Sequence, residues 1–213
     1  MAFYRSIITR AYKEVRNDFC KKENNNTVLT SLNFLNNSIG NGIVLDGSSN
    51  KTAKILVDSG INPSQIYVPE IDSKTHSFHR KNKLCIPFKG SVNKFIKDYD
   101  EEILENINWT YLDYMGIVYG NKTKGTYPLD DCLKILRKTK KNKVSMNMVF
   151  CVSKRLSRFF VSKDTILEET QHEIENIFDR ANFRIIKRHK VKKYKSRKMD
   201  MGFFSYNIEK KDI

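Results

Sequence analysis

The sequence has few of the residues that membrane, secreted and metal-binding proteins use in quantity. It holds four cysteines, and no two of them form a Cys-x-x-Cys pair, so a zinc site or thiol redox motif is not expected. No run approaches the roughly 18 apolar residues that a membrane-spanning helix needs. The first residues show no signal peptide. We therefore expect a cytoplasmic or nuclear protein that is not secreted, with no membrane partner and no metal.

Several catalytic motifs are also missing. With nine glycines, the sequence contains neither the phosphate-binding Gly-x-x-x-x-Gly-Lys-Ser/Thr pattern nor the Gly-x-Ser-x-Gly turn of hydrolases. His76 and His79 have a helical spacing that suits a metal, but no third ligand lies nearby in the sequence. A P-loop nucleotidase and a hydrolase with a catalytic triad are therefore not expected.

Positive charge is abundant and unevenly placed. The 213 residues carry 39 Lys and Arg against 24 Asp and Glu, a formal net charge of +15, while 39% hydrophobic residues are enough for a core. Eight of the twelve residues from 187 to 198 are basic: Lys187, Arg188, Lys190, Lys192, Lys193, Lys195, Arg197 and Lys198. Residues 137–143 hold five more. Such clusters can neutralise phosphates, or they can simply protect a solvated strand and loop.

Apolar periodicity divides the chain into two parts. Residues 1–41 read as an N-terminal helical extension, with a helix over 3–20, a polar loop over 21–26 and a short helix within 27–39. From residue 42 to 213 strands alternate with helices. Strands are expected at 43–45, 65–68, 83–87, 109–112, 144–152, 183–186 and 202–208, and helices at 51–59, 91–107, 129–139 and 165–181.

This order predicts an α/β fold of the Rossmann-like type. Right-handed crossovers give a mostly parallel, seven-stranded sheet with helices on both faces. The last two strands are joined by a short basic segment that has no room for a crossover helix. We therefore expect the final strand to be antiparallel.

Polar residues follow each of the first four strands. The first strand leads into Asp46, Gly47, Ser48 and Ser49, and the second ends at Glu70, 23 residues after Gly47. Phe88, Lys89 and Ser91 follow the third strand, and Asp113 and Tyr114 follow the fourth. In parallel sheets ligands bind at this edge. The alternatives are that Asp46 caps a helix, that Glu70 is a surface acid, and that Asp72 is the acid that matters.

Together these residues resemble the class I S-adenosylmethionine-dependent methyltransferases, over roughly residues 42–210. The resemblance implies that Asp46, Gly47, Ser48 and Ser49 hold the methionine part of S-adenosylmethionine and that Glu70 holds its ribose. It places adenine near Phe88, Lys89 and Ser91, and the transferred methyl and its acceptor near Asp113 and Tyr114.

The sequence departs from the family at several positions. The glycine-rich first motif is reduced to Gly47, and Ser91 stands where an acid is usual. The segments 112–116 and 120–129 look like uncharacterised methyltransferase-like proteins of large DNA viruses and protists, which carry no known substrate.

Two motifs bear on the acceptor. No Asp/Asn-Pro-Pro-Tyr/Phe follows the fourth strand, so amino-methylation of adenine or cytosine is not indicated. Ribose 2′-O-methyltransferases use Lys-Asp-Lys-Glu, for which Lys13, Asp113 and Lys154 occupy matching places. A lysine there could help to deprotonate a hydroxyl, so Lys154 joins Asp113 and Tyr114 as a catalytic candidate. No Glu stands in the fourth position, because Glu209 comes too late.

The sequence therefore predicts methyl transfer from S-adenosylmethionine to a nucleic acid, RNA rather than DNA, with the basic segment 187–198 steering the polyanion. One alternative is a catalytically degenerate Rossmann-like domain that binds nucleic acid or a protein partner. Another is a protein or small-molecule methyltransferase.

Overall fold

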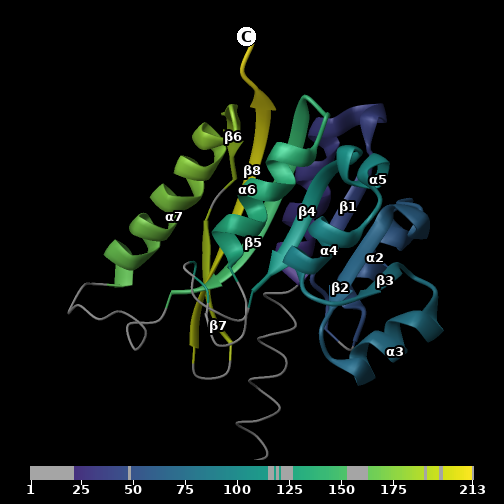
Figure 1. Cartoon of the computed structure of the whole chain (residues 1–213). Coiled ribbons are helices and arrows are strands. Elements are labelled where there is room, and N and C mark those ends of the chain that lie inside the picture. The colour runs from purple at the N-terminus through teal and green to yellow at the C-terminus, as the bar shows by residue number, and fades with distance from the viewer. Residues whose placement is uncertain are drawn as a thin grey trace, which may run out of the picture.

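The computed structural model describes residues 22–47, 49–114, 118, 120, 127–152, 163–189, 191–196 and 199–212. An eight-stranded sheet forms the centre (Figure 1), with strand order β3-β2-β1-β4-β5-β8-β6 and β7 paired to β8. The strands are β1 (Asn41–Val44), β2 (Ile66–Glu70), β3 (Ile86–Lys89), β4 (Ile107–Asp113), β5 (Lys143–Cys151), β6 (Phe183–Arg188), β7 (Lys192–Ser196) and β8 (Met199–Lys210). Strands β1 to β5 run parallel, and β8 is antiparallel to β5, β6 and β7.

The helices connect these strands. They are α2 (Lys51–Asp58), α3 (Ser73–Asn82), α4 (Val92–Asp98), α5 (Glu101–Glu105), α6 (Pro128–Lys138) and α7 (Lys163–Arg180), with 3-10 helices η1 (Asn33–Ser38) and η2 (Pro63–Gln65). Residues 22–32 form a further helix before η1. Within the part of the chain that the structure describes, none of the helices is both long and apolar enough to cross a membrane.

The predicted α/β class, the mostly parallel sheet and the antiparallel final strand are confirmed. The sheet has eight strands and not seven, because residues 192–196 of the basic segment form β7, which continues along the same edge of β8 as β6. The helix expected over 91–107 is two helices, since Tyr99 has extended dihedral angles and Asp100 caps α5. The loop expected over 21–26 is helical from residue 22, and α3, which has little apolar character, was not predicted.

Alternation along the central strands divides the core between the two faces of the sheet. In β5, Val144, Met146, Met148 and Phe150 face one apolar cluster, together with residues of α4, α5, α6 and α7. Val149 and Cys151 face the other, with residues 28–35 and α2. Because successive side chains of a strand point to opposite faces, β5 contributes apolar side chains to both cores. Figure 1 shows α6 and α7 packed on the near face of the sheet.

Buried hydrogen bonds hold the helix over residues 22–32 on the sheet. The hydroxyl of Ser31 lies 2.7 Å from that of Ser145, and the Asn147 amide donates to Ser31 Oγ at 3.1 Å. Val28, Leu32 and Leu35 are buried in the same cluster as β1 and β4. Residues 22–38 therefore pack on the sheet, and the division of the chain at residue 41 stays a prediction.

The main chain of Gly42 and the indole ring of Trp109 lie in close contact at the centre of the sheet. A Cβ atom on Gly42 of β1 would lie 2.1 Å from the Trp109 ring of β4. The indole Nε1 of Trp109 donates to the carbonyl of Gly40 at 3.0 Å. Glycine is required at position 42 because the ring occupies the space that any side chain would need.

Candidate active site

Three acidic residues lie at equivalent positions on three adjacent strands. Val44 of β1 pairs with Tyr111 of β4, so Asp46 and Asp113 each follow two residues after this pair. Ile43 pairs with Tyr67 of β2, so Asp46 and Glu70 each follow three residues after that pair. Neighbouring strands are about 4.8 Å apart. The register therefore brings Asp46, Glu70 and Asp113 together at the carboxyl edge, where the sequence predicted the site.

Asp46 is buried and holds the start of α2. Its Oδ2 accepts hydrogen bonds from the main-chain N–H groups of Thr52 and Ala53, both at 2.9 Å. Its carbonyl oxygen lies 3.3 Å from Nε2 of His79, which is fully buried on α3. The helix-capping alternative for Asp46 is thus correct, and His79 takes part in this main-chain contact.

Tyr111 of β4 is a buried phenol next to the end of β1. Burial raises the pKa of its hydroxyl well above the usual value, and the negative charges of Asp113 and Asp46 raise it further. The Tyr194 hydroxyl of β7 adds to this effect, while a hydrogen bond with Asn24 opposes it. The end of β4, the end of β1 and the helix over residues 22–32 therefore meet around one buried phenol.

Two buried amides near the candidate site have polar atoms without a hydrogen bond. Both side-chain polar atoms of Asn50 and the Nδ2 atom of Asn24 are buried without a partner. Buried polar groups are nearly always bonded, so such atoms mark a place where water or a ligand binds. A Cβ atom added to Gly47 would have no neighbouring atom within 4 Å. These groups fit a polar ligand such as the amino-acid end of a cofactor, and sequence reasoning missed Asn24.

At the end of β2, Glu70 is half-buried and its Oε1 accepts from the Asp72 N–H at 2.6 Å. Asp72, the alternative acid, caps α3 by accepting from Thr75 N–H at 2.8 Å, and this hydrogen bond lowers its pKa. Glu70 is therefore the better ribose candidate. Ile71 between them is 59% exposed, an apolar surface beside the acid that the sequence analysis did not single out.

The residues that follow β3 are tied into local structure. The ring of Phe88 packs edge-on against Phe95, with ring centroids 5.4 Å apart, and against Tyr99. Lys89 Nζ donates to the carbonyl of Ile71. Ser91 Oγ accepts from the Lys94 N–H at 3.2 Å and caps α4. Phe88 remains partly exposed, while Ser91 has a structural role.

The two catalytic candidates at the end of β4 face different ways. Asp113 is half-buried and contributes to the charge near Tyr111. Tyr114 is 7% exposed, stacks on Phe150 and donates its hydroxyl to Asp131 at 2.9 Å. In this structure Tyr114 supports the end of β4 from the α6 side. Its hydroxyl is bonded to Asp131 and is therefore not directed at a methyl acceptor. Lys13, Ser48 and Lys154 lie outside the described residues.

Part of the basic segment is used inside the protein. Arg188 forms a two-point ion pair with Glu175, both contacts at 2.8 Å. Lys192 Nζ donates to the carbonyl of Glu23 and to Thr27 Oγ1. Lys187, Lys193 and Lys195 are exposed, and Lys190, Arg197 and Lys198 lie outside the described residues. The prediction that the whole segment steers a polyanion is thus weakened for Arg188 and Lys192.

Glu209 lies at the opposite edge of the sheet. It pairs with Lys143, the first residue of β5, and its carboxylate binds Arg184 at 2.9 Å. The register therefore agrees with the sequence, which finds no glutamate in the fourth position of the Lys-Asp-Lys-Glu pattern.

The sequence matches no protein-family model and no curated protein. Solved structures with a similar fold include M. jannaschii TYW2 in complex with AdoMet, with a TM-score of 0.54, 12% identity, and coverage of 81% of this chain and 70% of that one. A Pyrococcus horikoshii protein assigned as an RNA methyltransferase gives 0.52, 11%, and 87% and 83%. A SAM-dependent methyltransferase from Methanosarcina mazei gives 0.51, 12%, and 81% and 93%.

At these identities the comparisons establish the fold. The similarity extends over 81–87% of this chain, with TM-scores of 0.51–0.54. The chain therefore has the Rossmann-like fold found in class I S-adenosylmethionine-dependent methyltransferases.

Proposed function

We propose that this protein transfers a methyl group from S-adenosylmethionine to a nucleic acid, RNA rather than DNA. One observation carries the proposal: Asp46, Glu70 and Asp113 lie in register at the ends of three adjacent parallel strands. Ligands of doubly wound sheets bind at this edge. The structural neighbours named for AdoMet binding and SAM-dependent methyl transfer support the choice of cofactor.

Each residue has a role in this proposal. The two carboxylate oxygens of Glu70 suit the two ribose hydroxyls, and Ile71 and Phe88 offer apolar surface to the adenine. Gly47 leaves the main chain open to the methionine end, and the unbonded Nδ2 atoms of Asn24 and Asn50 can serve as donors there. When bound, the cofactor supplies an electrophilic methyl, and the protein contributes mainly by positioning it and the acceptor near Asp113.

The net charge of +15 favours a polyanionic partner, which supports a nucleic acid of either kind. The choice of RNA is supported by one structural neighbour that is assigned as an RNA methyltransferase. The resemblance to viral and protist proteins stays a prediction and contributes no substrate.

Calorimetric titration with S-adenosylmethionine tests the cofactor site. Gly47→Ala should fold normally, because the new methyl meets nothing in the structure, yet weaken binding by at least about tenfold if the cofactor lies against this turn. Glu70→Gln keeps an acceptor for the Asp72 N–H but loses the charge, and we expect a loss of about 10- to 100-fold. Glu102→Gln, the same change at an exposed acid on α5, is the control.

Equal affinity in the wild type, Gly47→Ala and Glu70→Gln proteins would contradict the assigned pocket. Transfer of a labelled methyl group into purified RNA, DNA, protein or small-molecule fractions then identifies the acceptor. Label confined to protein or small molecules would contradict the nucleic-acid proposal while leaving the cofactor site in place.

A second candidate is a binding module without catalysis. It is favoured by the Asp46 carboxylate, whose Oδ2 already accepts two main-chain hydrogen bonds, and by the single glycine of the turn. An unchanged melting temperature with saturating S-adenosylmethionine, together with salt-sensitive RNA binding, would support it.

A further inference from the structure

A pocket opens at the edge of the sheet opposite the candidate active site. It has a volume of about 730 Å³ and lies between α4, α5, α6 and the end of β8. The Lys140 N–H donates to the carbonyl of Glu105, just before β4 begins, and β5 begins at Lys143. The pocket is therefore at the amino ends of the parallel strands, and we call it the amino-edge pocket.

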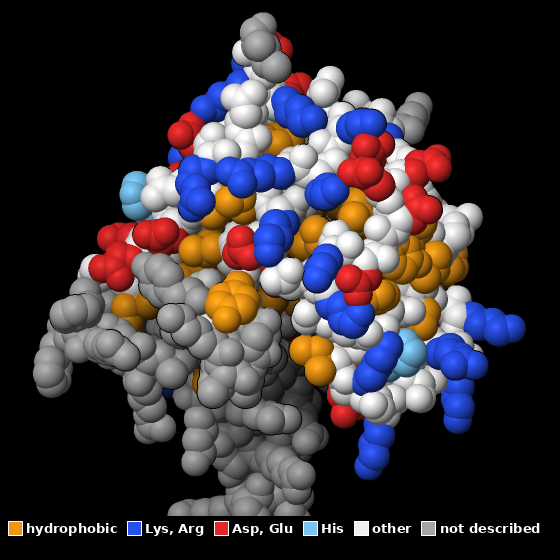
Figure 2. All heavy atoms as spheres, in the orientation of Figure 1, with side chains coloured by type: hydrophobic (Ala, Val, Ile, Leu, Met, Phe, Trp, Pro, Cys, Tyr) orange, Lys and Arg blue, Asp and Glu red, His pale blue; other side chains and the backbone are white. Residues whose placement is uncertain are grey.

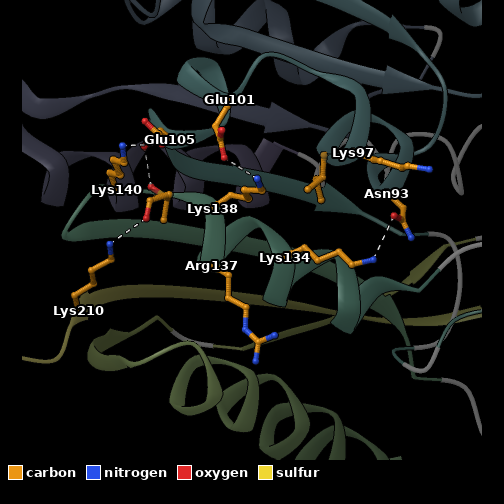
Figure 3. Close-up of a pocket in the computed structure, with 11 residues that line it drawn as sticks. Asn93, Lys97, Glu101, Glu105, Lys134, Arg137, Lys138, Lys140 and Lys210 are labelled. Atoms are coloured by element: carbon orange, nitrogen blue, oxygen red, sulfur yellow. Dashed lines mark hydrogen bonds and ion pairs between the residues drawn. The ribbon is translucent and has the colours of Figure 1, made fainter.

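Its lining is mainly cationic. Two acids, Glu101 and Glu105, stand among six basic residues: Lys97, Lys134, Arg137, Lys138, Lys140 and Lys210. Figure 3 shows the residues that line the pocket, with the side chains of Lys97 and Arg137 extending in different directions, and Figure 2 shows Lys and Arg side chains gathered over α6 on this face. The formal charge of the lining is +4, which attracts an anion.

Interactions within the protein leave two of the six cations available. Lys134 pairs with Asp130 at 2.7 Å, and Lys210 donates to the carbonyl of Thr139 at 3.0 Å. Lys138 pairs with Glu101 at 2.9 Å and Lys140 with Glu105 at 2.7 Å. Among the residues that the structure describes, Lys97 and Arg137 form no ion pair and both are exposed. Arg184 and Arg188 of β6 differ from these two residues, because each forms an ion pair with a carboxylate. The pocket therefore offers a phosphate more unpaired charge than these arginines do.

We propose that the amino-edge pocket binds phosphate groups of a nucleic acid strand, with Lys97 and Arg137 as the main contacts. The guanidinium fork of Arg137 can bind two phosphate oxygens, and Lys97 adds a second charge. An anionic membrane fits less well, because the exposed large apolar side chains of the described chain, Ile71, Phe78, Tyr127 and Ile186, do not line the pocket.

The distance between the two sites sets the length of the strand that spans them. The seven residues of β4, which ends at Asp113, extend over about 23 Å at ~3.3 Å per residue. A stacked strand rises ~3.4 Å per nucleotide, so about seven nucleotides are needed to reach from the pocket to Asp113. Only this estimate of strand length rests on the proposed function, since binding of phosphate in the pocket needs no methyl transfer.

Fluorescence anisotropy with a labelled 20-nucleotide RNA tests the pocket. The variant Lys97→Gln/Arg137→Gln should bind at least about tenfold more weakly at low salt, with the slope of log K against log salt reduced by about 1.4. The control Arg80→Gln/Lys81→Gln removes the same charges from exposed positions at the end of α3, and its affinity should fall clearly less. Melting temperatures of both variants establish that they fold.

Equal losses in the two variants would overturn the proposal, because the charge would then act without a specific site. Inorganic phosphate at constant ionic strength should compete only at millimolar levels; binding of free phosphate or mononucleotide as tight as that of RNA would also overturn it. The proposal would also be overturned if the pocket variant lost its binding to phosphatidylserine vesicles but kept its binding to RNA. Absence of methyl transfer in the wild type contradicts the proposed function and leaves the anisotropy result unaffected.

Discussion

The Tyr114 hydroxyl donates a hydrogen bond to Oδ2 of Asp131 at 2.9 Å, and the two side chains are 7% and 3% exposed. This bond joins the end of β4 to the first turn of α6. The other carboxylate oxygen of Asp131 is buried and has no hydrogen-bond partner. Burial raises the pKa of Asp131 to about 6, an effect that the bond from Tyr114 partly opposes.

Asp131 should make stability depend on pH. Its pKa is higher in the folded than in the unfolded protein, so its contribution to stability is complete below pH ~4 and is lost as the pH rises through about 6. A shift of about 2 units corresponds to at most about 3 kcal/mol. Asp131→Asn should remove this loss of stability with rising pH. Urea unfolding of both proteins at pH 4, 5, 6 and 7.5 measures the free energy of unfolding. A stability difference between variant and wild type that is constant over this range would refute the expectation.

Gly42 should not tolerate a side chain. Gly42→Ala places a methyl 2.1 Å from the Trp109 ring, so we expect a loss of at least about 2 kcal/mol, or failure to fold. In a Trp109→Leu background the same change should cost much less, since the ring is gone. Thermal unfolding of the single and double variants gives the coupling energy, and additive losses would show that the contact is not responsible.

The buried pair Ser31 and Asn147 should show coupled energetics. Removing either partner leaves a polar group buried without its bond, at a cost of about 1–3 kcal/mol. Ser31→Ala and Asn147→Ala together should cost less than the sum of the single changes. Chemical denaturation of the four proteins in this cycle measures the difference. A coupling energy near zero would mean that this hydrogen bond does not help to hold the helix over residues 22–32 on the sheet.

Cys85, Cys132 and Cys151 should react slowly with thiol reagents in the native protein. All three are buried free thiols. Burial raises the pKa of Cys85 to about 12 and also raises that of Cys132, which keeps both protonated at pH 8. Mass spectrometry after timed labelling, with and without denaturant, identifies the modified sites. Rapid native labelling of any of the three would show that its region opens more readily than the structure implies.

Much of the fold was predictable because it is a local property of the sequence. The alternation in residues 144–152 gives a central strand with two apolar faces, and the amphipathic pattern of residues 165–181 gives α7. Helix α3 was missed because its surface is mostly polar, and the strand at 192–196 was missed because basic residues are poor evidence for a strand.

The candidate site was predictable in part. The positions of Asp46, Glu70 and Asp113 after their strands follow from the order of the chain and the rule for parallel sheets. That Asp46 bonds to Thr52 and Ala53, that Tyr114 faces Asp131, and that the Nδ2 atoms of Asn24 and Asn50 are buried without a partner depend on how the chain packs in space. Periodicity carries no information about such contacts.

The sequence by itself determined the fold class, the single reversed strand and the edge at which the acids gather, because strand and helix periodicity act over a few residues. Only the tertiary structure decided which cations remain available for a phosphate. Arg188 and Lys192 looked free in a basic run, yet folding brings Glu175, Glu23 and Thr27 to them, whereas Lys97 and Arg137, far apart in the chain, meet around one pocket. Charge pairing is a property of distances in space, which the linear order of residues does not contain.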